Sequence, residues 1–147
     1  MSRRIPVLAL VAGLVACTRE SAPIRIATAG PWTQRFGQMN KRGIDLAIEE
    51  VNAHGGIAGR RLELVVRDDE GDGAKAAAIA NEFVADPQVV AVIGHVTSGA
   101  MVAAARVYDQ GLPAVSTTAS SPDLSGISPW VFHVISSDSA NGLDIAR

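Results

Sequence analysis

The segment from Gly94 to Gly99 has the residue types of an anion-binding loop. It reads GHVTSG, and it lies between an apolar stretch and an alanine-rich segment with helical spacing. A strand that passes through such a loop into a helix leaves backbone N–H groups unpaired at the start of the helix, beside the hydroxyls of Thr97 and Ser98. Three anions fit this chemistry: a phosphate, the oxyanion of a reaction intermediate, or the carboxylate of a bound small molecule.

Catalytic and metal chemistry find little support in the rest of the chain. Ser98 does not lie in a G-x-S-x-G turn, and no later histidine follows an acid in an order that suggests a relay. G-K-[ST] and G-x-G-x-x-G phosphate loops are absent. His54, His95 and His133 are far apart and lack the spacing of metal ligands. We therefore expect no enzyme, no metal site and no cofactor.

The acidic pair Asp68-Asp69 invites comparison with phosphate-accepting receiver domains. The stretch that would supply the acceptor aspartate reads VIGH and contains none, and the later strands lack the lysine that would pair with the phosphoryl group. The pair is better interpreted as a solvated acidic turn that begins a helix, where carboxylates are favourable.

Five short segments rich in β-forming residues are separated by segments with helical periodicity. The expected strands are Ile24–Thr28, Leu62–Arg67, Val89–Ile93, Pro113–Ser116 and Trp130–Ile135. Apolar residues spaced i, i+3, i+4, i+7 give each of two helices one apolar stripe: Ile44, Ala47, Ile48 and Val51 in the first, and Ala76, Ile79, Ala80 and Phe83 in the second. Strands joined by single helices pair in parallel, so the sequence predicts an α/β fold with a doubly wound parallel sheet.

Ligands of such sheets bind outside the carboxyl ends of the strands, near the point where the strand order reverses. The loops expected there are Ala29–Gln34, Asp68–Asp72, Gly94–Gly99, Thr117–Pro122 and Ser136–Ser139. The loops at Gly94 and Thr117 are rich in hydroxyls and contain no lysine or arginine, whereas a phosphate site normally brings a positive charge. These loops favour a small ligand that is uncharged or carries both charges.

The first residues have the pattern of an export signal. Arg3 and Arg4 precede an apolar run that is too short to span a membrane, and the run ends at Leu14-Val15-Ala16-Cys17. Residues 1–16 are therefore expected to be a signal peptide, and Cys17, which then begins the mature chain, resembles the acylated cysteine of bacterial lipoproteins. Cleavage would remove two of the 13 basic residues and none of the 15 acidic ones, leaving a net charge of −4, which does not favour nucleic acid.

Several segments together resemble the branched-chain amino acid binding proteins of ABC transporters. The resemblance runs from about Ile24 to the end of the chain. It rests on NAHGGIAGRRLEL from Asn52, on RDD from Arg67, on VIGH from Val92, and on LPAVS from Leu112 through SPDL ending at Leu124. Its most specific part is the N-A-x-G-G-I-x-G segment followed at fixed spacing by the acidic pair.

The resemblance implies a type I periplasmic binding protein, a receptor whose two lobes close on an amino acid and present it to a membrane permease. Ser98 corresponds to the hydroxyl that contacts the ligand carboxylate, and the backbone carbonyl of Thr118 corresponds to the acceptor of the ligand ammonium. Ser120 stands where the family usually has a threonine that contacts both groups. Ala119 belongs to the same loop, and Phe36 loosely matches the aromatic residue that covers the ligand side chain.

Departures from the family pattern bear on the side-chain preference and on the length. Thr117 replaces a common proline, and Gly71 and Thr97 stand where some members place a disulfide pair. Family members are more than twice as long, so residues 17–147 are expected to be the N-terminal ligand-binding lobe of a longer protein. Its location would be periplasmic or at the cell surface, held by a lipid. The same fold and loops also suit a sensor that regulates a partner protein.

Overall fold

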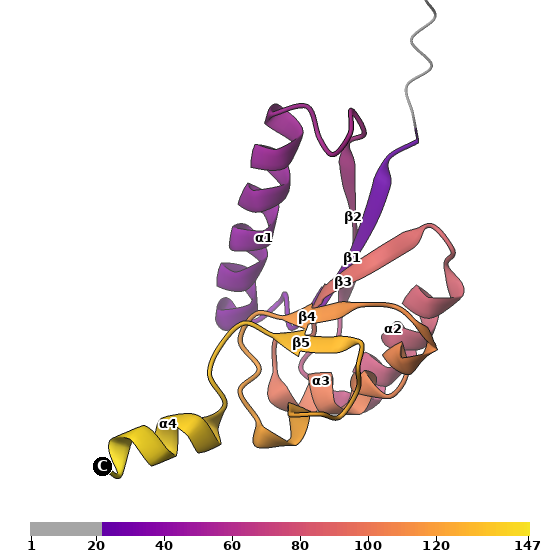
Figure 1. The fold of residues 1–147 in the computed structure, drawn as a ribbon. Helices are drawn as coiled ribbons and strands as arrows, with labels where there is room; N and C mark the ends of the chain where they lie inside the picture. Colours follow the sequence, from indigo (N-terminus) through magenta and orange to yellow (C-terminus); the bar gives the residue numbers. More distant parts are fainter. Residues whose placement is uncertain (1–21) are drawn as a thin grey trace, which may run out of the picture.

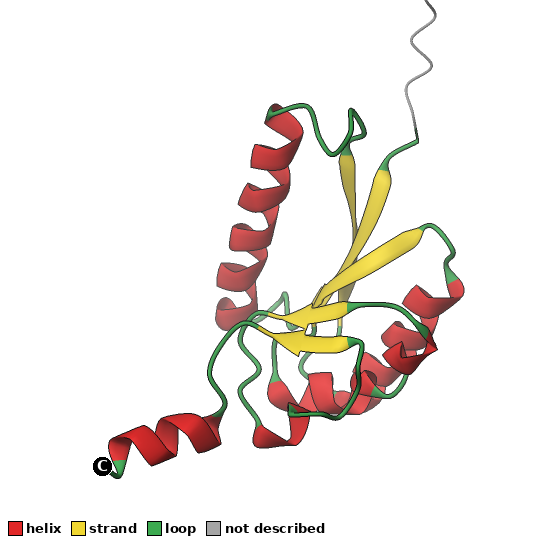
Figure 2. Ribbon diagram, in the orientation of Figure 1, coloured by secondary structure: helices red, strands yellow, loops and turns green. Residues whose placement is uncertain are grey.

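A computed structural model describes residues 22–147, which form one parallel sheet with helices on both faces (Figures 1 and 2). The five strands have the order β2-β1-β3-β4-β5, and every neighbouring pair is parallel. Their bounds are β1 Ile24–Gly30, β2 Leu62–Asp68, β3 Val89–Gly94, β4 Ala114–Ser116 and β5 Val131–His133. The predicted doubly wound parallel sheet is confirmed. The signal peptide and Cys17 lie outside the described residues.

Single α-helices connect the first four strands, as the sequence periodicity predicts, whereas only a 3₁₀ turn lies between β4 and β5. The helices are α1 Arg35–Ala53, α2 Gly73–Ala85, α3 Ser98–Ala105 and α4 Asp138–Ile145, with short 3₁₀ turns at Tyr108–Gln110 and Pro122–Leu124. Figure 1 shows α1 on one face of the sheet and α2 and α3 together on the other, whereas α4 extends away from the body after β5. Within the described part of the chain, no helix is both long and apolar enough to span a membrane.

The main core lies between the sheet and the pair α2 and α3. One row of side chains crosses the sheet in register on this face: Val65, Ala27, Val92, Ala114 and Val131. The helices pack small residues against this row, including Ala76, Ala80, Ala100 and Ala104, which are all fully buried. Small side chains on both sides let the helices approach the strands closely, so close packing comes mainly from alanine and valine.

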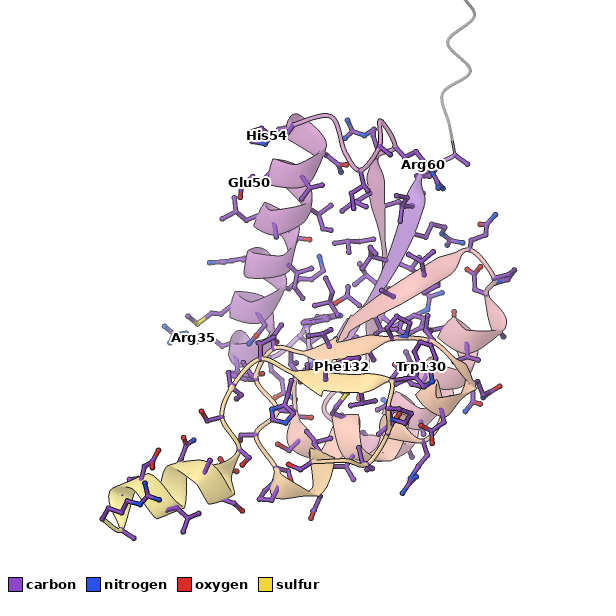
Figure 3. The ribbon with its side chains drawn as sticks, viewed as in Figure 1. Arg35, Glu50, His54, Arg60, Trp130 and Phe132 are labelled. Carbon is purple, nitrogen blue, oxygen red and sulfur yellow. The ribbon has the colours of Figure 1, made fainter. Side chains whose placement is uncertain are left out.

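The opposite face of the sheet is only partly covered, because α1 is its one helix among residues 22–147. The row on this face includes Thr28, Ile93, Val115 and Phe132. Thr28 is fully buried, whereas Phe132 on the edge strand β5 is 52% exposed (Figure 3). Apolar surface therefore remains uncovered over β4 and β5 in the described residues.

The fifth strand is shorter than the predicted Trp130–Ile135. Its partner β4 has only three residues, and β5 pairs with it through Val131, Phe132 and His133. A strand with one short neighbour has no further ladder to join, so the chain leaves the sheet after His133 although Val134 and Ile135 are β-branched.

Strand order reverses between β1 and β3, because β2 lies on one side of β1 and all later strands lie on the other. The chain therefore passes to α1 on one face after β1 and to α3 on the other face after β3, at the carboxyl end of the sheet. This is the location that the sequence predicted for a ligand.

Candidate functional site

Ser98 is the first residue of α3, and its side chain connects two loops. Thr97 is the N-cap residue and makes no side-chain capping bond. The Ser98 Oγ instead accepts the backbone N–H of Ser120 at 3.2 Å and that of Ser121 at 3.3 Å. Because both bonds use the oxygen as an acceptor, the Ser98 hydroxyl proton is left to donate elsewhere. Ser98 therefore does not act as the cap of α3, which is Thr97.

The start of α3 leaves backbone donors beside this hydroxyl. Met101 is the first residue of α3 whose backbone N–H donates to a carbonyl group, the carbonyl of Thr97. Within residues 22–147, the N–H groups of Ser98, Gly99 and Ala100 meet no hydrogen-bond acceptor. The positive end of the helix dipole lies at the same place, so this point favours a negatively charged group.

The loop Thr117–Pro122 is held against the loop after β3 by hydrogen bonds. Thr118 Oγ1 donates to the carbonyl of Val96 at 2.7 Å, and the Ala119 N–H donates to Ser116 Oγ at 3.2 Å. Ala119 is fully buried, whereas Thr118 and Ser120 are partly exposed. The carbonyl groups of Thr118 and Ala119 accept no hydrogen bond from the described residues, so both remain able to receive a donor.

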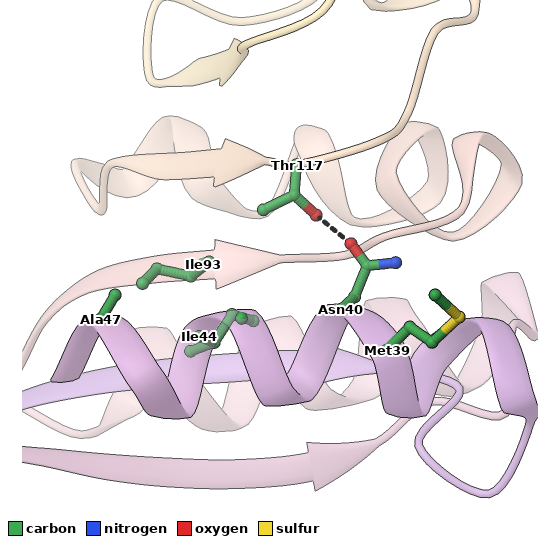
Figure 4. Close-up of a pocket in the computed structure, with 7 residues that line it drawn as sticks. Met39, Asn40, Ile44, Ala47, Ile93 and Thr117 are labelled. Carbon is green, nitrogen blue, oxygen red and sulfur yellow. Dashed lines mark hydrogen bonds between the residues drawn. The ribbon is translucent and has the colours of Figure 1, made fainter. Parts of the chain in front are cut away.

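Phe36 lies in the first turn of α1 and is half exposed. Asn40, one helical turn later on the same face, accepts a hydrogen bond from Thr117 Oγ1 at 3.0 Å (Figure 4). This bond holds the start of α1 beside the loop that contains Thr118 and Ser120. The sequence placed Phe36 in the site only through the resemblance, and it gave no sign of Asn40.

A groove of about 490 Å³ opens beside this contact, between α1 and the uncovered face of the sheet (Figure 4). Its lining is mostly apolar: Met39, Asn40, Gly43, Ile44, Ala47, Ile93 and Thr117. Only Thr117 belongs to the hydroxyl-rich loops, so the groove is separate from the surface formed by Ser98, Thr118 and Ser120.

The interpretation of Asp68 and Asp69 as a solvated turn is wrong. Asp69 is fully buried, and its Oδ2 lies 2.6 Å from Nδ1 of His95, which is also fully buried. The Asp68 carboxylate accepts the backbone N–H groups of Trp32 at 3.2 Å and Thr33 at 3.1 Å. Both carboxylates therefore hold neighbouring loops in place, and α2 begins later, at the N-cap Asp72.

The electrostatic character of the site comes from neutral groups. Helix N–H groups and hydroxyls supply donors, backbone carbonyls supply acceptors, and the loops Gly94–Gly99 and Thr117–Pro122 contain no basic side chain. Among residues 22–147, no three histidine, cysteine or acidic side chains gather as metal ligands would. The arrangement can donate hydrogen bonds to an anionic group and accept them from a cationic group of the same small molecule.

A family model described as periplasmic binding protein matches residues 24–147. The chain belongs to this family. A leucine-, isoleucine-, valine-, threonine- and alanine-binding protein of Pseudomonas aeruginosa is 34% identical over 137 residues, which cover 90% of this chain and 36% of the relative. An amino acid binding protein of the same organism is 36% identical over 111 residues, which cover 73% of this chain and 30% of the relative.

Solved structures agree with the assignment to the periplasmic binding proteins. An ABC transporter substrate-binding protein from Desulfitobacterium hafniense superposes with a TM-score of 0.79 at 37% identity, over 84% of this chain and 37% of that one. The branched-chain amino acid transporter substrate-binding protein of Streptococcus pneumoniae, solved with isoleucine, gives 0.75 at 31% identity, over 80% of this chain and 35% of that one. The fold is that of the N-terminal lobe of a type I periplasmic binding protein, and the chain spans about a third of the length of these relatives.

Proposed function

We propose that this periplasmic binding protein holds a branched-chain or similar amino acid and delivers it to the permease of an ABC transporter. The observation that carries the proposal is the Ser98 hydroxyl, which keeps its proton free to donate beside the unpaired N–H groups of α3. Relatives whose names state that they bind leucine, isoleucine and valine support the ligand class. Family membership supports solute binding over catalysis and a periplasmic location.

The ligand carboxylate would accept hydrogen bonds from Ser98 Oγ and from the first N–H groups of α3. A hydrogen bond to a charged group is stronger than one between neutral groups, and the helix dipole adds to it. The ligand ammonium would donate to the free carbonyls of Thr118 and Ala119, and the Ser120 hydroxyl lies in the same loop. A site without a fixed charge suits a ligand that carries both signs.

Phe36 would contact the ligand side chain. Its half-exposed ring lies one turn before Asn40, whose contact with Thr117 brings this end of α1 to the head-group loop. An apolar ring at this position favours an aliphatic side chain over a charged one.

Residues 17–147 would act as the first of two lobes that close around the amino acid. The relatives that match are nearly three times the length of the matched segment, which supports this view. Residues 1–16 would be removed on export, and a lipid on Cys17 would hold the mature protein to a bacterial membrane.

Titration calorimetry of the full-length protein with leucine, isoleucine, valine and a polar amino acid tests the proposal. We expect the aliphatic amino acids to bind, and Ser98→Ala to weaken their binding by roughly 1.5 to 3 kcal/mol, which is about a 10- to 150-fold higher Kd. Ser128→Ala is the matched control. Its hydroxyl accepts the N–H of Trp130 before β5, at the end of the sheet opposite these loops, so this change should leave the Kd unaltered.

Equal affinities in wild type and Ser98→Ala would rule out the carboxylate assignment. Turnover of the ligand during the titration would contradict a pure binding function. Binding with full affinity but without ligand uptake in cells that carry the permease would favour the regulatory sensor.

A further inference from the structure

Three buried side chains form a continuous hydrogen-bonded cluster beneath the proposed binding loops. His95 Nδ1 lies 2.6 Å from Asp69 Oδ2, and His95 Nε2 lies 3.0 Å from the hydroxyl of Tyr108. All three side chains are fully buried. Asp69 follows β2, His95 follows β3, and Tyr108 begins the 3₁₀ turn after α3, so the cluster joins three segments of the fold. We call these residues the buried triad.

The hydrogen bonds of the buried triad are satisfied by one arrangement of protons. The Tyr108 hydroxyl must donate its proton, and His95 Nε2 is its hydrogen-bond partner among the described residues. Nε2 is then an acceptor, and the imidazole proton lies on Nδ1, which donates to Asp69. The second oxygen of Asp69 accepts the N–H of Gly71 at 2.8 Å, so the buried carboxylate is held by two donors.

Burial and the negative charge of Asp69 raise the pKa of Tyr108 above its ordinary value, so the phenol keeps its proton at neutral pH. The phenol therefore has a proton to donate to His95 Nε2, 3.0 Å away.

We propose that the buried triad sets the position of the head-group site and that His95 is its positioning residue. This inference rests on the proposed function and adds to it residues that never touch the ligand. His95 and Tyr108 stand on either side of α3 in the sequence, and their bond joins the segment before this helix to the segment after it. The His95–Asp69 bond then holds the N-terminal end of α3, with Ser98 and its free N–H groups, against the end of β2.

The backbone of His95 carries the connection to the second loop. Ser116 Oγ donates to the His95 carbonyl at 2.6 Å and accepts the N–H of Ala119 at 3.2 Å. The loop that contributes the Thr118 and Ala119 carbonyls is therefore held through the same residue that holds α3. A displacement of His95 moves both halves of the head-group site, the one for the carboxylate and the one for the ammonium.

Apolar residues of similar size would fill this volume without a buried charge. A buried charged group adds little net stability, because removing it from water costs about as much as its hydrogen bonds return. A polar network in which every donor and acceptor is paired instead specifies one geometry. The triad has no route to a substrate, since all three side chains are fully buried, so a catalytic role does not apply.

Tyr108→Phe tests the proposal, because it removes one hydroxyl and keeps the ring. In the full-length protein we expect a Kd for leucine that is about threefold to tenfold higher. The amides of Ser120 and Ser121 should exchange with solvent faster by a similar factor. Nitrogen-15 spectra of the imidazole in wild type should show a proton on Nδ1 and none on Nε2, and the variant should change the Nε2 signal.

Phe83→Leu is the control for a general loss of stability. Phe83 is buried in α2 and shares no hydrogen bond with the triad, so this variant should unfold at a lower temperature with the Kd and the loop exchange unchanged. An imidazolium or a proton on Nε2 in wild type overturns the proton arrangement. Wild-type Kd and wild-type exchange in Tyr108→Phe overturn the positioning role. If wild type binds no amino acid, the proposed function fails, and the exchange of Ser120 and Ser121 still decides the role of the triad.

Discussion

Tyr108 shows how one buried side chain ties stability to pH. It is fully buried, and burial raises its pKa above the ordinary value of 10.0, with the negative charge of Asp69 adding to the effect. The folded protein therefore holds the phenolic proton more tightly than the unfolded chain does. The stability that follows is complete below about pH 10 and is lost as the pH rises toward the pKa of the folded state.

We expect the free energy of unfolding to fall above about pH 10 by up to roughly 1.4 kcal/mol per pH unit through this group. Urea unfolding between about pH 8 and pH 12 measures it. Lysines titrate in the same range, so the quantity of interest is the difference between wild type and Tyr108→Phe. A difference that does not change with pH would show that the phenol titrates normally.

Residues of the candidate site could be located from the sequence where they follow a strand. Ser98, Thr118 and Ser120 lie in loops that the expected strands already placed at one edge of the sheet, and the structure brings these loops into contact. Asp69 could not be interpreted in this way. Its burial depends on His95, 26 residues later in the chain, and an acidic sequence such as DDEGD is typical of a solvated turn.

At the scale of elements, two glycines of α1 have opposite roles. A Cβ atom on Gly37 would lie 2.0 Å from the carbonyl oxygen of Pro31, so only glycine lets the helix approach the loop after β1 this closely. A Cβ atom on Gly43 would meet no atom within 4 Å. In the second position glycine only weakens the helix.

Gly37→Ala should therefore destabilise the fold by about 1 to 3 kcal/mol, because helix or loop must shift to relieve the overlap. Gly43→Ala should stabilise it by about 0.5 to 1 kcal/mol through helix propensity. Thermal and urea unfolding of the two variants measure both changes. Equal effects of the two substitutions would contradict the close approach of α1 to Pro31.

The order and type of the elements followed from sequence periodicity, whereas their ends did not. Alternating β-type and helical patterns predicted the parallel sheet, because parallel strands need long crossover connections, which are usually helices. The residues at which β5 begins and ends depend on the strand beside it. How much of the α1 face of the sheet is buried depends on which helices pack there. A single sequence carries no local signal of such neighbours.

At the scale of the whole molecule, the uncovered face over β4 and β5 shows where this unit would meet other protein. Phe132 is 52% exposed and Val134 is 70% exposed, on or next to a strand whose other face belongs to the core. Exposed apolar surface of this kind marks a contact with another part of a protein. We expect residues 22–147 alone to bind an apolar fluorescent dye, and the full-length protein to bind it less.

Attachment to a membrane is the other property of the whole molecule that can be tested. Mass spectrometry of the mature protein should find an acylated Cys17 at the N-terminus. The wild-type protein should sediment with membranes, because several acyl chains bind a bilayer firmly. Cys17→Ser has no site for acylation and should move the protein to the soluble fraction. An unmodified thiol on Cys17 would contradict the lipoprotein assignment.

Arg60 lies where the described chain enters the sheet, and its guanidinium donates to the carbonyls of Ala22 at 2.8 Å and Pro23 at 3.2 Å (Figure 3). This entry is at the amino end of β1, opposite the binding loops. With a lipid at Cys17, the entry to the sheet at Arg60 would lie close to the membrane, since five residues, 17–21, span at most about 18 Å. The seven residues of β1 add about 23 Å between this entry and the binding loops. The loops would then lie within about 40 Å of the anchor, so the length of this connection would set the effective concentration of the lipidated receptor at a membrane partner.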